Sequence, residues 1–355
     1  GLAAPLMARL AGLRSSAGRL MAAPVFGALL LSLADGAVQL AGHLTSLRIP
    51  TGAATALIGG PLILALVPRI ANLTRPDVFP APTVLSRRPR GPVLAGLATA
   101  FAVTVILVLT VGSDADGWRA DLALVEWRLA RVGLLAAAGA LIGMAGTVVQ
   151  RLTGNPMASP EVLGVGVGAG AGLAVVLVAT PLAGLAAQAT GMMAGAVVTL
   201  FALLALVRRH GFGAERLLIA GIALGALLSS VLTSVIATGS PAGFLLLGWI
   251  SGSLIDPSAG MAIGTAVLLA ALIPLVLANA RPLAILPLGE SAARSLGLAT
   301  AATQAGLVLI AGVATAVSTL SIGPMSFIGL IAPHIARSLG LGRPVAHLSG
   351  AMLAG

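Results

Sequence analysis

The chain is divided into apolar stretches of about 20 residues, the length a helix needs to cross the hydrocarbon core of a bilayer. Ten stretches match or approach this length: 21–42, 51–68, 93–112, 129–150, 161–180, 187–207, 217–238, 258–280, 300–318 and the shorter 322–337. A further apolar piece at 243–254 predicts a half-helix or re-entrant segment. The predicted fold is therefore all-α, a polytopic membrane protein with about ten transmembrane helices.

Composition supports this class and excludes several others. Hydrophobic residues make up 58% of the chain and charged residues 8%, whereas soluble domains carry about 25% charged residues. The chain has no cysteine, which excludes disulfides and thiolate metal sites. Its four histidines, His43, His210, His334 and His347, show no metal-ligand spacing. We therefore predict no metal site, no bound cofactor and no catalytic centre.

All basic residues are arginines, and their distribution predicts the orientation in the membrane. The linker from Arg69 to Pro92 carries five arginines and is assigned to the cytoplasm by the positive-inside rule. Alternating the spans from there places 16 of the 20 arginines inside. A Walker A loop requires a lysine, so this chain cannot bind ATP through that motif. The arginines lie in short loops between spans, so their charge indicates contact with membrane lipid rather than with nucleic acid.

The two ends of the chain resemble each other. Residues 1–27 and 329–355 align without a gap and share 11 identities, including the ordered run G-L-x-A-P-x-x-A-R. This repeat predicts a parent protein built by tandem duplication, with the Pro/Arg-rich linker joining its halves.

Several motifs together resemble the permease subunits of ATP-driven importers for iron–siderophore complexes and vitamin B12. Residues 126–131 are similar to the family's R-L-P-R motif, and residues 150–164 to its Q-x-x-x-x-N-P-L-A-x-P-x-x-L-G loop. Residues 248–254 are similar to W-x-x-G-S-L, and residues 288–297 to L-G-x-x-x-A-x-x-L-G. In these motifs and in the C-terminal stretch, ten residues are predicted to have a structural role: Asn155, Pro156, Gly164, Trp249, Gly323, Pro324, Gly329, Pro333, His334 and Arg337.

The resemblance implies an order of parts within the chain. Residues 1–68 correspond to the last helices of a first permease half, and residues 69–92 to a cytoplasmic linker. Residues 93–355 correspond to a second half that stops after its eighth helix. Two permeases fused in one polypeptide are typical of ferric hydroxamate importers.

The loop at 288–297 contains a predicted short surface helix. Glu290 and Arg294 are spaced for an i, i+4 ion pair, and Leu288, Ala292 and Leu296 fall on one face. Spacing alone leaves an ordinary amphipathic loop equally open. The resemblance implies the segment that docks on the ATPase, formed by Leu288, Gly289, Glu290, Ala293, Arg294, Leu296 and Gly297.

Cations at the outer face have two interpretations. Arg128 and Arg131 can anchor a helix end at the membrane interface by snorkelling. The resemblance instead implies docking of acidic side chains of a substrate-binding protein. Arg48 stands where the family has a glutamate, which reverses that charge.

The resemblance implies a permease that moves a ferric siderophore, of the hydroxamate type, across the bacterial cytoplasmic membrane by alternating access. ATP and Mg²⁺ bind to a separate ATPase subunit, expected in two copies, and a periplasmic or lipid-anchored binding protein delivers the chelate. Vitamin B12, haem, ferric citrate and ferric catecholates remain alternative cargoes. An ion-coupled secondary transporter is the competing class and requires intramembrane acids, of which Asp35 is the main candidate. The chain itself is predicted not to be an enzyme.

Overall fold

The computed structural model describes residues 90–114, 117–120, 122, 125–180, 183–210, 213–252, 258–325 and 327–355, with isolated positions 21, 22, 25, 28 and 61. The predictions for Arg48, for Asp35 and for the first spans lie outside the described residues. The division at residues 68 and 92 depends on the sequence repeat and stays a prediction.

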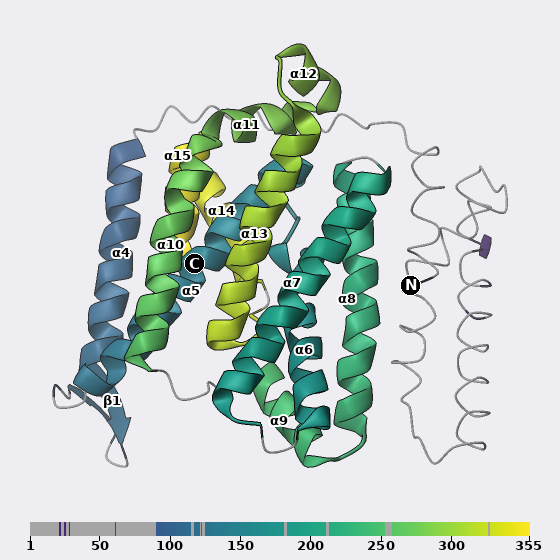
Figure 1. The fold of residues 1–355 in the computed structure, drawn as a ribbon. Helices are drawn as coiled ribbons and strands as arrows, with labels where there is room; N and C mark the ends of the chain where they lie inside the picture. Colours follow the sequence, from purple (N-terminus) through teal and green to yellow (C-terminus); the bar gives the residue numbers. More distant parts are fainter. Residues whose placement is uncertain are drawn as a thin grey trace, which may run out of the picture. The chain divides into compact units, whose positions relative to one another are not determined.

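The described elements are helical apart from one hairpin (Figure 1). In chain order they are α4 (Arg90–Thr110), β1 (Val111–Asp114), β2 (Gly117–Ala120), α5 (Val125–Thr153), η1 (Pro160–Leu163), α6 (Val165–Ala179), α7 (Leu185–His210), α8 (Ala214–Ala237), α9 (Pro241–Ile250), α10 (Ala259–Ala278), α11 (Ala280–Ile285), η2 (Leu286–Leu288), α12 (Glu290–Ser295), α13 (Thr300–Ile322), α14 (Ile328–Ser338) and α15 (Pro344–Ala354).

Within the described residues, six helices are long and apolar enough to cross a membrane: α4, α5, α7, α8, α10 and α13. They confirm six of the predicted spans, because a continuous apolar run without polar interruptions favours one uninterrupted helix in lipid. The predicted half-helix is also confirmed, since α9 has 10 residues.

Two predicted spans form shorter helices. The apolar stretch 161–180 gives α6, with 15 residues, and the stretch 322–337 gives α14, with 11 residues. At 1.5 Å per residue they are about 22 and 16 Å long, short of the roughly 30 Å hydrocarbon core. The prediction of a span at 322–337 is therefore wrong. Gly323 has a φ of 80° and Pro324 follows it, so the backbone leaves the helix there.

A small hairpin was missed by the sequence analysis. Strands β1 and β2 pair antiparallel, with Val111 opposite Ala120 and Asp114 opposite Gly117. Their sequences, VGSD and GWRA, lack the alternation of apolar and polar residues that marks a strand. The hairpin is a small addition to a fold that is otherwise helical in the described residues, and the all-α fold class is confirmed.

The described helices belong to two compact units. One unit contains α6, α7, α8 and most of α9. Its α6–α7 contact depends on glycines, since a Cβ at Gly168 would lie 2.9 Å from the Gly195 carbonyl oxygen. Removing side chains lets the two backbones approach closely, as is common in membrane helix pairs.

The other unit is built around α5, which contacts α4, α10, α13, α14 and α15. The second half of α5 is almost entirely buried, from Ala137 to Leu152. In contrast, α4 has no buried residue. Thus α5 is the central helix of this unit, and α4 lies at its edge.

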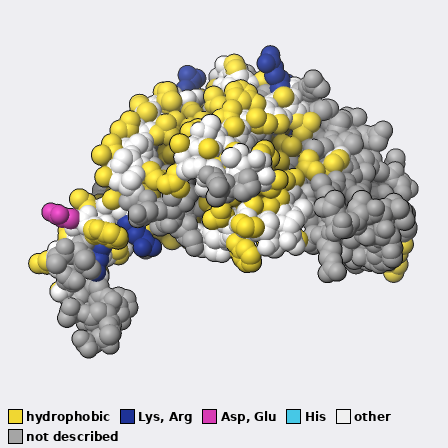
Figure 2. All heavy atoms as spheres, turned by 60° about the horizontal axis from the view of Figure 1, so that its bottom comes forward, with side chains coloured by type: hydrophobic (Ala, Val, Ile, Leu, Met, Phe, Trp, Pro, Cys, Tyr) yellow, Lys and Arg dark blue, Asp and Glu magenta, His cyan; other side chains and the backbone are white. Residues whose placement is uncertain are grey.

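Large apolar side chains remain exposed on several long helices, among them Ile106 of α4, Phe201 of α7 and Val267 of α10. Figure 2 shows hydrophobic side chains over most of the described surface in view, with charged side chains at its margins. A surface of this kind is suited to lipid rather than to water.

Candidate functional site

The segment predicted to dock on an ATPase is a short helix between two tight turns. Helix α12 follows Gly289, with a φ of 98°, and precedes Gly297, with a φ of 76°. Arg294 donates a hydrogen bond to the Glu290 carboxylate within an i, i+4 ion pair, as predicted. Both side chains are exposed, so the pair orders the surface of the helix and adds little to stability.

The predicted apolar face of this helix is wrong in its details. Ala293 is fully buried, whereas Leu288 and Leu296 are each about half exposed. Gly289, with a φ of 98°, separates Leu288 from the helix, whereas Leu296 keeps the hydrogen bond from its amide to the Ala292 carbonyl at 3.1 Å and lies at the C-terminal end of α12. Consequently α12 is anchored through Ala293, and two leucines flanking it face outward.

Arg151 of α5 connects α11, the helix that precedes α12, to α15 and to the loop before α15. It lies at the end of α5 and is 8% exposed. Its Nη1 donates to the Leu283 carbonyl of α11 at 3.4 Å, and its Nη2 donates to the Gly342 carbonyl at 2.6 Å. Its Nε donates to Nδ1 of His347 at 3.1 Å. We call Arg151, His347 and these acceptors the arginine network.

His347 has one tautomer that fits this network. Its Nδ1 accepts from Arg151, so its proton resides on Nε2, which donates to the Pro333 carbonyl at 2.8 Å. Pro333 lies inside α14, and its carbonyl accepts a hydrogen bond from a side chain of α15. The network therefore connects α5, α11, α14 and α15 at one point.

The loop after α5 is shaped by Asn155. Its side-chain Oδ1 accepts from the Met157 amide at 2.9 Å, and its backbone carbonyl accepts from the Ala158 amide at 3.1 Å. This is the turn chemistry that an Asn-Pro pair favours. At its far end Gly164 has a φ of 73° and starts α6.

The structure brings this loop and the C-terminal motif together. A Cβ at Gly329 would collide with the ring of Pro160, and Gln150 Nε2 donates to the Leu330 carbonyl at 3.2 Å. Three oxygens nearby in the sequence, Gln150 Oε1, Ser159 Oγ and Glu161 Oε1, are buried without a hydrogen-bond partner in the described residues. A buried oxygen without a partner costs free energy, and packing at this junction offsets that cost.

A second junction joins Gly323 to the Trp249 motif. A Cβ at Gly323 would lie 2.9 Å from the Trp249 carbonyl oxygen and 3.5 Å from Cα of Gly252. Gly323 also has a φ of 80°, so glycine is required both for its backbone angle and for this close approach. Pro324 follows it and is partly buried.

The predicted outer-face cations differ in their surroundings. Arg128 donates from Nη1 to the carbonyls of Leu109 and Val111, at 3.2 and 3.0 Å, and so caps the end of α4. Arg131 is exposed. Arg48 lies outside the described residues. A docking role for these cations stays a prediction.

His334 is exposed on α14, and Arg337 is partly buried on the same helix. Among the described residues, no three His, Cys, Asp or Glu side chains are grouped to hold a metal ion. The site is thus one of packing and hydrogen bonding.

Sequence reasoning missed Arg151 and His347 as interacting residues. From the sequence, Arg151 is predicted only to be one of the arginines at the inner face and part of the 150–164 loop. A signal was present, since His347 lies in an apolar run and a polar residue there needs a partner. The sequence does not identify Arg151 as this partner, because 196 positions separate the two residues.

These features define a polytopic helical membrane protein with an exposed short helix, α12. The chain belongs to the FecCD transport family, whose sequence profile matches residues 93–355. The resemblance to iron–siderophore and vitamin B12 permeases is therefore confirmed.

Individual relatives agree with this assignment. The chain is 39% identical over 365 residues to the iron(3+)-hydroxamate import system permease protein FhuB of Salmonella typhimurium, covering 100% of this chain and 53% of FhuB. FhuB of Escherichia coli is also 39% identical, with 54% of it covered. The vitamin B12 import system permease protein BtuC of Citrobacter koseri is 37% identical over 277 residues, covering 74% of this chain and 82% of BtuC.

A solved structure of a metal-chelate type ABC transporter, in an inward-facing conformation, matches with a TM-score of 0.66. It is 22% identical, and the match covers 75% of this chain and 86% of that chain. This likeness shows the fold alone. The chain spans about half the length of the FhuB relatives it matches.

Proposed function

We propose that the chain belongs to the membrane-spanning permease of an ATP-driven importer for ferric hydroxamate siderophores. The observation that carries the proposal is the 39% identity to FhuB over the whole of this chain. The identity to BtuC covers only 74% of the chain, which favours a hydroxamate over vitamin B12 as cargo. The chain would perform no covalent chemistry and would act in the bacterial cytoplasmic membrane.

The exposed helix α12 supports a contact with an ATPase subunit. Leu288 and Leu296 offer apolar side chains on both sides of the Glu290–Arg294 pair. A small apolar patch bordered by charges is typical of a docking surface. The proposed assembly has two ATPase subunits, which hold ATP and Mg²⁺, and a binding protein on the opposite face of the membrane.

The arginine network supports a route from this surface into the membrane. Leu283 lies a few residues before α12, and Arg151 fixes its carbonyl to the ends of α5 and α15. A displacement of α12 would therefore act on α14 through His347 and the Pro333 carbonyl. Rigid elements joined in this way are what an alternating-access cycle needs to couple ATP hydrolysis to opening of the path.

Charge reversal in α12 tests the ATPase contact. We expect Glu290→Arg to lower siderophore uptake about tenfold by weakening docking, since tenfold corresponds to about 1.4 kcal/mol. Membrane insertion should be unchanged, because the side chain is exposed. The matched control is Glu215→Arg, the same charge change at an exposed position at the start of α8. Normal uptake by Glu290→Arg, with expression equal to wild type, would contradict the assignment.

Cargo and energy source can be separated in reconstituted vesicles. We expect uptake of a ferric hydroxamate to need the ATPase subunit and to persist after ion gradients are collapsed. Excess ferric citrate or vitamin B12 should not compete. Uptake that stops when the ion gradients are collapsed would favour an ion-coupled secondary transporter. Competition by vitamin B12 would contradict the assignment of a ferric hydroxamate as the cargo.

About ten helices per permease and a tandem duplication are also part of this proposal. The aligned identities between residues 1–27 and 329–355 support a repeat. The half-length match to FhuB is compatible with two permease halves in one polypeptide.

A further inference from the structure

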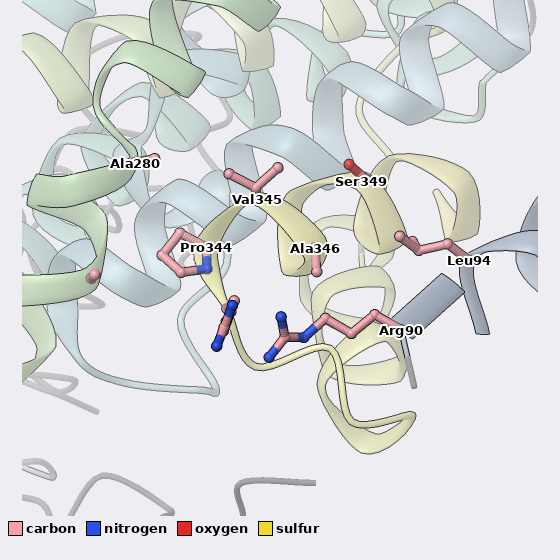
Figure 3. A pocket seen from close by; sticks show the side chains of 9 residues that line it. Arg90, Leu94, Ala280, Pro344, Val345, Ala346 and Ser349 are labelled. Atoms are coloured by element: carbon pink, nitrogen blue, oxygen red, sulfur yellow. The ribbon is translucent and has the colours of Figure 1, made fainter. Parts of the chain in front are cut away.

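A cavity of about 450 Å³ lies in the unit built around α5. It is next to the arginine network, since its lining residues Arg343 and Ala346 directly follow and precede Gly342 and His347 in the chain. Three elements line it: α4 through Arg90 and Leu94, α11 through Ala280 and Ala284, and α15 with its preceding residue Arg343. Figure 3 shows the guanidinium of Arg90 directed toward the start of α15, with Pro344 and Ala346 nearby and Leu94 on the α4 side.

The cavity combines two cations with apolar walls. Within the described residues, neither Arg90 nor Arg343 has an ion-pair partner, and no carboxylate lines the cavity. The N-terminal ends of α4 and α15 lie here, and unpaired amide groups at helix starts add partial positive charge. The remaining lining is aliphatic apart from Ser349. The cavity therefore suits an anion attached to an apolar group.

The predicted position of the cavity in the membrane indicates which class of ligand it can bind. Arg90 and Arg343 both belong to segments assigned to the inner face by the positive-inside rule. Helix α4 has no buried residue along its whole length, so acyl chains can lie against it directly above the cavity. Basic cavities between helices at the cytoplasmic face are suited to anionic lipid headgroups.

We propose that this cavity binds the phosphate of an anionic phospholipid from the inner leaflet, held by Arg90 and Arg343, with an acyl chain along α4. The site depends on the predicted membrane topology and not on the identity of the cargo. Bound lipid would join α4 to α11 and α15, since each of these elements contributes to the lining.

Native mass spectrometry of the intact protein in detergent tests the proposal. The probes are dioleoyl phosphatidylglycerol and, for comparison, dioleoyl phosphatidylcholine. We expect the wild-type protein to retain phosphatidylglycerol preferentially. The double variant Arg90→Gln, Arg343→Gln should weaken its retention about fivefold for each arginine. The variant Arg90→Lys, Arg343→Lys should restore most of it, because the charge is kept.

The matched control is Arg131→Gln, which removes one exposed arginine at the other end of α5 and should leave retention unchanged. Equal retention of the two lipids by the wild type would overturn the proposal, and so would equal losses in the double variant and the control. Displacement of phosphatidylglycerol by millimolar inorganic phosphate would instead identify a site for free anions and overturn the lipid assignment. Circular dichroism verifies that each variant is folded.

Discussion

Alanine at Gly146 is expected to destabilise the protein by about 3 kcal/mol, because a single methyl group cannot be accommodated there. Gly146 lies in the buried half of α5, and its Cβ would collide with the carbonyl oxygen of Gly329 at the start of α14. The obstacle is backbone, with Cα of Gly329 only 3.1 Å away, so no side-chain rotation can relieve it. Helix α14 would have to move away from α5.

The measurement is thermal unfolding in detergent, followed by tryptophan fluorescence. Gly146→Ala should lower Tm by about 5–10 °C. Gly133→Ala is the control in the same helix, since its Cβ would meet only Ala262 Cβ at 3.9 Å, an ordinary contact. A Tm of Gly146→Ala equal to that of Gly133→Ala would mean that α14 does not pack against α5 in this way.

Methionine at Arg151 is the second large expected effect. The substitution keeps an unbranched side chain but removes the hydrogen bonds to His347, Leu283 and Gly342. Hydrogen bonds to charged groups contribute about 1.5–3 kcal/mol each, and relief of the buried charge offsets part of that. We expect a net loss of about 3 kcal/mol and a decrease in uptake, since α11 and α15 would no longer be joined.

Two further variants test whether the loss of stability comes from the directed hydrogen bonds of Arg151 or from the loss of its charge. Arg151→Lys keeps the cation but lacks the planar fork, so it should recover less than half of the lost stability. Arg131→Met removes an exposed arginine from the same helix and should change the free energy of unfolding by no more than about 0.5 kcal/mol. Full recovery by lysine would show that the three directed hydrogen bonds are not needed.

Predictions from local pattern succeeded where one segment decides the outcome. The spans at 93–112 and 129–150 became α4 and α5, and the Glu290–Arg294 pair formed as its spacing required. Predictions failed where turns interrupt a pattern. Leu288 is separated from α12 by the turn at Gly289, and the stretch 322–337 is broken at Gly323.

The glycines illustrate the same limit. Gly168 and Gly172 of α6 lie against α7. In α5, Gly139 and Gly143 have the i, i+4 spacing of a small-residue face, and with Gly146 they lie against the backbone of α14, of α15 or of the residue after it. Spacing indicates that a helix has a small-residue face, but the partner of that face is a property of the whole unit.

The sequence by itself determined the membrane class, the position of most long helices in the described residues and the family. These follow from hydropathy and short motifs, which are local properties of consecutive residues. Only the tertiary structure decided that Arg151 meets His347 and that Gly146 meets Gly329. Such contacts join positions almost 200 residues apart in the chain. They depend on how helices cross, and no local pattern fixes that because many arrangements bury the same apolar residues equally well.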